Sequence, residues 1–117
     1  MKTTIGAQGE SMACDYLVGR GYRVITRNYR TRQGEIDIIA ARQGWLVFVE
    51  VKTRRSLRCG VGAEAVTWRK QRHLLAAALA YLAAHPCEKC RFDVVEITLP
   101  AGAAPSIRHI ENAFGRN

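Results

Sequence analysis

Three charged side chains interrupt an apolar stretch between Gly34 and Lys52. The stretch reads GEIDIIAARQGWLVFVEVK, and Asp37, Glu50 and Lys52 stand among isoleucine, valine and phenylalanine residues. Burying an unpaired carboxylate costs free energy, so such a residue needs a nearby cation, a hydrogen-bond partner or a shared proton. The spacing of these charges therefore indicates a functional site within a hydrophobic core.

The stretch predicts two β-strands joined by a tight turn at Gln43–Gly44. Such a turn pairs Arg42 with Trp45. Counting outward, Asp37 falls opposite Glu50. Facing side chains have Cβ atoms about 4.5–5.5 Å apart, where two like charges repel. A hard divalent cation such as Mg²⁺ relieves that repulsion, because it prefers oxygen ligands and keeps water molecules that a phosphate can replace.

Lys52 shares a face with Glu50, two residues further along the same predicted strand. Its ammonium group could stabilise charge on a phosphate oxygen or orient an attacking water. The same register puts Glu35 opposite Lys52, so a salt bridge at the strand end is the alternative interpretation. Because that alternative leaves Asp37 without a partner, we favour a metal site.

The first predicted helix, over residues 4–18, carries a further carboxylate on its apolar face. Glu10 lies seven residues before Leu17 and shares its side of the helix. It fits equally a metal ligand, direct or through water, and a first-turn glutamate turned to solvent and favoured by the helix dipole. Asp93 and Glu96, in the later segment RFDVVEITL, have no such partner pattern, and we interpret them as structural or exposed.

The rest of the chain predicts an α/β fold. Strands are expected over 22–30 and 91–99, and an Ala/Leu-rich helix over about 63–84. Residues 100–117 form either an extra strand or a tail. The order α-β-β-β-α-β predicts one domain over residues 1–117, with a central mixed sheet flanked by helices.

Composition and charge favour a nucleic-acid partner. The 117 residues carry 18 lysines and arginines against 10 aspartates and glutamates, a formal net charge of +8. Such a charge on a short chain favours a polyanion. The longest apolar stretch, residues 74–84, is too short and too rich in alanine to span a bilayer, and the start shows no secretory signal. We therefore expect no membrane association and a cytoplasmic location.

Basic residues surround the predicted site in three groups and predict contacts to a phosphate backbone. Such contacts are independent of base sequence and strongly salt-dependent. One group follows the second strand of the hairpin, one precedes the first, and one opens the long helix. From the start of that helix Lys70 and Gln71 could reach the site, and Arg69, Arg72 and His73 compete for the same role. The nucleic-acid-binding residues that we predict are Arg54, Arg55, Arg58, Arg30, Arg32, Lys70 and Gln71.

The four cysteines include the pair Cys87 and Cys90, whose spacing occurs in zinc sites. A complete structural zinc site needs four ligands, and Cys14 and Cys59 lie far from this pair in the sequence. We interpret the cysteines as ordinary thiols in a reducing cytosol.

These segments resemble the YraN family. GEIDIIA is followed by VFVEVKTR, after a helix that contains GE and before RFDVV, and the resemblance covers nearly the whole chain. The pattern Asp37, twelve residues, Glu50-Val51-Lys52 resembles the D-x(n)-E-x-K core of the PD-(D/E)xK nuclease superfamily. The YraN family is also similar to Holliday-junction resolvases. Ile36 stands where the superfamily name has proline, a position outside the chemistry.

The resemblance implies a restriction-endonuclease-like fold and a metal-dependent endonuclease that acts on DNA, with branched or structured DNA as substrate. It implies that Asp37 and Glu50 bind Mg²⁺ or Mn²⁺ together with the carbonyl group of Val51. Lys52 would be the catalytic lysine, and Glu10 the acidic member on the helix. Enzymes that cut DNA junctions act on two strands, so the resemblance also suggests a homodimer. The alternative is a non-catalytic nucleic-acid-binding or accessory protein that retains this fold.

Overall fold

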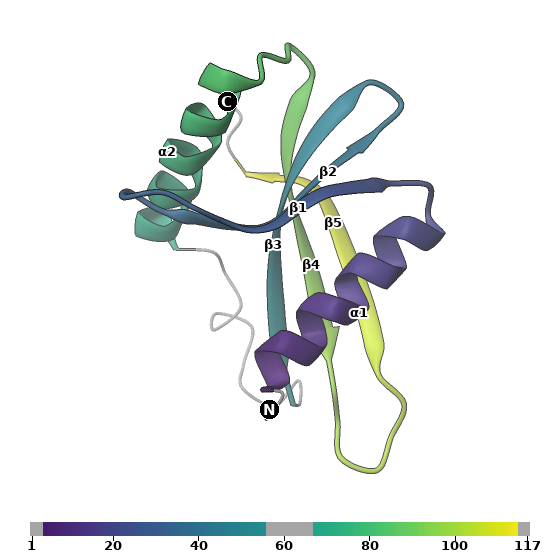
Figure 1. Ribbon diagram of the computed structural model, residues 1–117. Helices are drawn as coiled ribbons and strands as arrows, with labels where there is room; N and C mark the ends of the chain where they lie inside the picture. The colour runs from purple at the N-terminus through teal and green to yellow at the C-terminus, as the bar shows by residue number, and fades with distance from the viewer. Residues whose placement is uncertain (1–3, 56–66, 115–117) are drawn as a thin grey trace.

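The computed structural model describes residues 4–55 and 67–114, which form a five-stranded sheet and two helices (Figure 1). The strands lie in sequence order across the sheet; β3 and β4 are parallel, and the other neighbours are antiparallel. This arrangement confirms the predicted α/β fold with a mixed sheet, and it is compatible with a restriction-endonuclease-like fold. The elements are α1 (Ile5–Gly19), β1 (Arg23–Arg30), β2 (Glu35–Arg42), β3 (Trp45–Arg54), α2 (Trp68–Ala84), β4 (Cys90–Thr98) and β5 (Ser106–Phe114).

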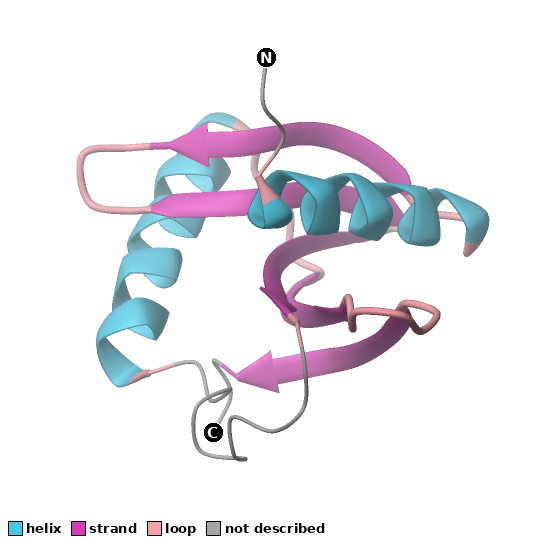
Figure 2. Cartoon of the chain, turned by 90° about the horizontal axis from the view of Figure 1, so that it is seen from below, coloured by secondary structure: helices cyan, strands magenta, loops and turns pink. Residues whose placement is uncertain are grey.

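The two helices cover opposite faces of the sheet (Figures 1 and 2). Leu17 of α1 packs in one core with Val49 of β3, and Leu74 of α2 packs in the other with Phe48. Adjacent β3 residues enter different cores because side chains alternate between the faces of a strand. Full burial of each such side chain contributes about 1.5–3 kcal/mol. Strand β3 therefore lies at the centre of the molecule.

The β2–β3 hairpin turns at the predicted residues. Gln43 and Gly44 have φ values of 52° and 85°, as a two-residue turn of type I′ requires. Arg42 pairs with Trp45, so the predicted register is confirmed at the turn.

The β2–β3 ladder ends at the pair Ile38–Val49. The next pair would be Asp37 with Glu50, as the sequence predicts, but the two described strands do not form it. Strand β2 continues beside β1 alone as far as Glu35, while β3 continues beside β4 to its end. The sheet therefore splits at the two carboxylates, and the prediction that they form a facing ladder pair is wrong.

Two glycines allow the helices to approach the strands beside this split. A Cβ atom on Gly34 would collide with the backbone carbonyl of His73 in α2. A Cβ atom on Gly9 would collide with the side chain of Thr53 in β3. Glycine permits both approaches because it has no side chain. The glycines of the two GE pairs thus have a packing role next to the predicted site.

Helix α2 begins at Trp68, because Thr67 is its N-cap and the Thr67 hydroxyl accepts a hydrogen bond of 3.1 Å from the N–H of Lys70. The predicted start of this helix, at about residue 63, lies outside the described ranges. Strand β5 occupies part of the segment that the sequence leaves as a strand or a tail. Neither described helix is long and apolar enough to cross a membrane.

Candidate active site

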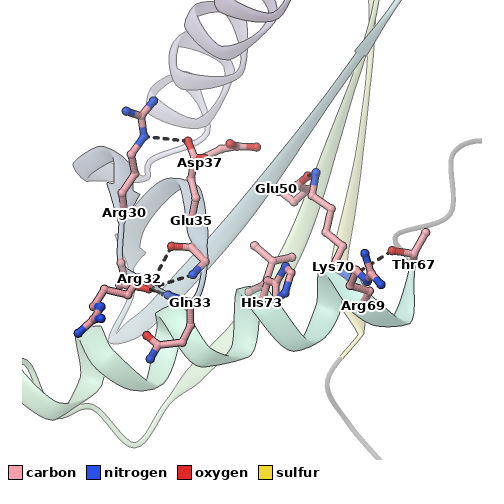
Figure 3. A pocket seen from close by; sticks show the side chains of 13 residues that line it. Arg30, Arg32, Gln33, Glu35, Asp37, Glu50, Thr67, Arg69, Lys70 and His73 are labelled. Carbon is pink, nitrogen blue, oxygen red and sulfur yellow. Dashed lines mark hydrogen bonds and ion pairs between the residues drawn. The ribbon is translucent and has the colours of Figure 1, made fainter.

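A cavity of about 590 Å³ lies where β2 and β3 separate (Figure 3). Asp37 and Glu50 both line it, and Glu50 is only 4% exposed. The structure thus brings together the two carboxylates that the sequence predicts. They meet where β2 and β3 separate, and not as a facing pair in the β2–β3 ladder. The β1–β2 connection and the start of α2 supply the other walls, with Arg30, Thr31, Arg32, Gln33, Gly34, Glu35, Thr67, Arg69, Lys70, His73 and Leu74.

The Asp37 carboxylate is fixed by the backbone of β3. Its Oδ2 accepts a hydrogen bond of 2.8 Å from the N–H of Val51. In a strand, the N–H and C=O of one residue point toward the same neighbour, so the Val51 carbonyl also faces the side of Asp37. Two carboxylates and a carbonyl are oxygen donors of the kind that Mg²⁺ and Mn²⁺ prefer. The donor set therefore fits the predicted cation.

The protonation of Asp37 reflects this crowding of negative charge. Burial raises the pKa of Asp37 to about 7, and the charge of Glu50 adds to the rise. The hydrogen bond from Val51 opposes the rise, and the charge of Glu10 contributes a smaller part of it. A raised carboxyl pKa beside a second carboxylate is typical of functional sites.

Lys70 of α2 forms an ion pair with Glu50, with Nζ 2.5 Å from Oε2. Partial burial alone would lower the pKa of Lys70. The hydrogen bond and charge of Glu50, with the charges of Asp37 and Glu35, outweigh burial and raise it above its ordinary value. Lys70 therefore reaches the site from the long helix, as predicted, but its pairing with Glu50 was not predicted. The start of α2 holds several adjacent cations, so sequence alone does not select which one reaches Glu50.

Lys52 lies two residues beyond Glu50 in β3, half-buried and abreast of Glu96 in β4. It is not among the described residues that line the cavity. The predicted pairing of Glu35 with Lys52 is wrong, because the β2–β3 ladder ends at Ile38–Val49. Glu35 pairs only with β1, where it lies opposite Arg30 and accepts a hydrogen bond of 3.4 Å from its Nε. The catalytic role of Lys52 stays a prediction.

Glu10 faces the sheet from the side opposite to α2. Its side chain is 17% exposed and forms an ion pair of 3.4 Å with Arg27 of β1. Its charge contributes to the raised pKa of Asp37, so it acts on the site from across the split. The interpretation of Glu10 as a first-turn glutamate turned to solvent is wrong, because α1 begins at Ile5 with no acidic residue in its first turn and the Glu10 side chain is mostly buried. Its role as a metal ligand stays a prediction.

Three of the predicted nucleic-acid contacts lie at the cavity. Arg30 and Arg32 reach it from the β1–β2 side and Lys70 from α2. Arg69, one of the residues that the sequence offers for the role of Lys70, also lines it (Figure 3). These cations surround the acidic centre from two sides.

Three further predicted nucleic-acid contacts, Arg54, Arg55 and Gln71, are described and lie away from the cavity. Arg54 forms an ion pair of 3.4 Å with Glu96, and Arg55 is exposed where β3 ends. Gln71 lines a smaller hollow on another side of α2, together with Trp68. A fourth residue, Arg58, lies outside the described ranges.

No group of three or more histidine, cysteine, aspartate or glutamate side chains in the described ranges is arranged to hold a metal ion. Mg²⁺ does not need such a cage, since it binds through one or two carboxylates and retains water. Structural zinc does need one. Cys87 and Cys90 form no disulfide, and their interpretation as ordinary thiols stays a prediction.

Comparison with known sequences gives the family. The chain matches the profile of Uncharacterised protein family UPF0102 over residues 9–97, a range that contains α1 from Gly9 onward, the cavity and most of β4. The chain belongs to the UPF0102 family. UPF0102 is the YraN family, so the resemblance seen in the sequence is confirmed.

UPF0102 proteins from several organisms are similar to this chain over almost their whole length. A UPF0102 protein of Trichlorobacter lovleyi is 50% identical, over 94% of this chain and 89% of its own. One from Symbiobacterium thermophilum is 50% identical, over 97% of this chain and 98% of its own. One from Geobacter sulfurreducens is 49% identical, over 94% and 88%. The family description assigns no activity, so function has to be inferred from the site.

Proposed function

We propose that this UPF0102 protein is a metal-dependent endonuclease that hydrolyses phosphodiester bonds in DNA. The observation that carries the proposal is the convergence of Asp37 and Glu50 in one cavity with Arg30, Arg32 and Arg69 on its walls. An acidic centre is suited to a divalent cation, and basic walls are suited to the phosphates on either side of a scissile bond.

When bound, Mg²⁺ or Mn²⁺ supplies Lewis-acid activation of the phosphate and lowers the pKa of the attacking water. Asp37, Glu50 and the Val51 carbonyl would hold the cation. The water oxygen bonds to phosphorus as the bond from phosphorus to the leaving strand oxygen breaks. One proton of the water ends on the leaving hydroxyl group, and the other passes to solvent. Lys52, on the Glu50 face of β3, would stabilise charge on a phosphate oxygen or orient the water.

The substrate class follows from the resemblance to junction resolvases and from the type of contact. Arginine and lysine around a cavity bind the backbone and carry no base-sequence information directly. Branched or structured DNA is therefore the proposed substrate. A homodimer would allow two strands to be cut symmetrically.

A second candidate function is DNA binding without cleavage, alone or as an accessory subunit. The Lys70–Glu50 ion pair favours this candidate, because it gives Glu50 a counter-charge without any metal. The same basic walls would then serve binding only.

A cleavage assay separates the two candidates. The full-length protein is incubated with branched, single-stranded and duplex DNA in Mg²⁺ or Mn²⁺, and then with EDTA. Metal-dependent cleavage that is lost in Asp37→Asn and Glu50→Gln, but kept in the exposed control Lys89→Gln, supports the enzyme. Tight binding with no cleavage of any substrate rejects it and supports the binding protein. Affinity that does not fall between 50 and 200 mM salt, roughly the range over which phosphate contacts weaken, would contradict the basic-wall interpretation.

A further inference from the structure

The ion pair between Lys70 and Glu50 joins a fixed carboxylate to a movable cation. Glu50 lies on the central strand and its side chain is 4% exposed, whereas the Lys70 side chain is 50% exposed. Figure 3 shows the Lys70 side chain extending from α2 across the cavity toward Glu50. The cation therefore reaches the carboxylate from the solvent side, while the carboxylate is held by the sheet.

The backbone of Lys70 is anchored and only its side chain is able to move. Its N–H donates to the Thr67 hydroxyl at 3.1 Å, within the N-terminal cap of α2. Beyond that anchor, a lysine has four methylene groups with low barriers to rotation and keeps its charge near water. Leaving Glu50 requires a change of rotamer and no movement of the helix.

We propose that Lys70 is an exchangeable counter-ion of Glu50, which a divalent cation displaces and which then turns to the phosphate of the substrate. The inference rests on the metal-dependent function proposed above and adds the order of events. A cation at Asp37 and Glu50 would bind the carboxylate whose Oε2 lies 2.5 Å from Lys70 Nζ, so the two positive charges compete for one carboxylate.

Other cations line the cavity beside Lys70. Arg69 lines the same cavity from the adjacent α2 position, and Arg30 and Arg32 line it from the β1–β2 side. Lys70 would join these cations around the cavity. The metal-free site keeps Glu50 paired with Lys70, whereas the metal-loaded site would offer one more cation to a phosphate. Metal binding and phosphate binding are thereby coupled through one side chain.

The first test measures metal affinity in the absence of DNA, so it does not depend on cleavage. Mn²⁺ binding is followed by electron paramagnetic resonance for the wild type, K70Q and R69Q. K70Q is expected to bind Mn²⁺ about fivefold more tightly than the wild type, the effect of removing one half-exposed ion pair. R69Q removes a neighbouring charge from the same cavity wall and should change affinity less than twofold, if only Lys70 competes directly. Unchanged or weaker binding by K70Q would overturn the proposal.

The second test uses the wild-type protein and avoids substitution altogether. An amine-reactive acetylating reagent is applied with and without saturating Mg²⁺, and the modified lysines are quantified by mass spectrometry. Mg²⁺ should raise the modification rate of Lys70 several-fold relative to the exposed Lys89. An unchanged rate, in a protein that calorimetry shows to bind Mg²⁺, overturns the exchange and leaves the proposed nuclease function intact. Absence of metal binding in both the wild type and K70Q would overturn both proposals.

Discussion

The Asp37 carboxylate accepts a hydrogen bond of 2.8 Å from the N–H of Val51, across the point where β2 and β3 separate. This bond supplies a partner for a backbone donor that the ladder no longer pairs with β2. It also keeps Asp37 beside Glu50, although burial and the charge of Glu50 raise the pKa of Asp37. The separation of β2 from β3 and the position of Asp37 are therefore linked by one hydrogen bond. Together they hold Asp37 and Glu50 close to each other, at a cost in folding free energy.

Replacing Asp37 with asparagine should stabilise the metal-free protein at neutral to alkaline pH. The pKa of Asp37 is about 7 in the folded protein, above the value of about 4 expected in the unfolded chain. Its ionisation therefore destabilises the fold increasingly as the pH rises from about 4 to 7, and not at all below 4. Asparagine cannot ionise and keeps an oxygen for the Val51 N–H. The gain at pH 8 is expected to be about 1–3 kcal/mol.

Urea unfolding in EDTA at pH 4 and pH 8 measures this difference. The free energies of unfolding of the wild type and Asp37→Asn should agree at pH 4 and diverge at pH 8. A variant that is less stable than the wild type at pH 8 would show that the ionised carboxylate contributes favourably to folding.

The hairpin could be predicted from the sequence because its determinants are local. A two-residue turn at Gln43–Gly44 sets the register, and the alternation of side chains carries that register outward. It holds from Arg42–Trp45 to Ile38–Val49. The same alternation places Glu50 on the α2 face, where it contacts Lys70.

The split beyond Ile38 could not be predicted, because it depends on contacts between segments distant in the sequence. Gly34 contacts α2 at His73, and Asn28 of β1, abreast of Asp37 by register, has a φ of 55°. Neither contact nor conformation follows from strand periodicity. The sequence also could not select Lys70 from its neighbours as the partner of Glu50. Successive residues of a helix point about 100° apart, so the angle of α2 over the sheet decides which side chain reaches Glu50.

Gly34→Ala should destabilise the protein by about 1–3 kcal/mol, the usual cost of overpacking a close contact. The new methyl group would meet the backbone carbonyl of His73, which cannot move aside without moving α2. Gly19→Ala is the matched control, because no neighbouring atom lies within 4 Å of the added carbon. Gly19 ends α1, so alanine there should be neutral or slightly stabilising. Thermal unfolding of both variants measures the contrast, and equal melting temperatures would argue against a tight contact at Gly34.

Lys52→Met should strongly slow the proposed cleavage while leaving metal binding unchanged. Loss of one charged group that stabilises the transition state lowers the rate by about 10²–10³-fold. Lys52 is not among the described residues that line the cavity, so Mn²⁺ affinity should stay within about twofold of the wild type. Single-turnover cleavage of branched DNA and Mn²⁺ titration give the two readouts. A variant that cleaves at the wild-type rate would remove Lys52 from the mechanism.

Asp93 is completely buried in β4, and it is structural, one of the two roles that the sequence allows. Its carboxylate accepts hydrogen bonds of 3.0 and 3.2 Å from Arg91 and one of 2.9 Å from the N–H of Asn112 in β5. His109 Nε2 lies 2.7 Å from it, and the other ring nitrogen of His109 lies 3.2 Å from the Tyr16 hydroxyl in α1. One carboxylate thus links α1, β4 and β5.

Asp93→Asn is expected to lower the free energy of unfolding by about 3 kcal/mol or more at pH 7, because Arg91 would lose its buried counter-charge. Burial alone would raise the pKa of Asp93, but the hydrogen bonds from His109, Arg91 and Asn112 outweigh it and lower the pKa. The stabilisation is therefore present above about pH 4 and is lost as the pH falls through the lowered value. Urea unfolding at pH 7 and pH 2 should show that the difference in free energy of unfolding between the wild type and Asp93→Asn becomes smaller in acid.

Glu111→Gln is the control, since Glu111 is 57% exposed and 3.9 Å from Arg91. This substitution should lower the free energy of unfolding by less than about 1 kcal/mol. Equal losses in the two variants would contradict a central role for Asp93.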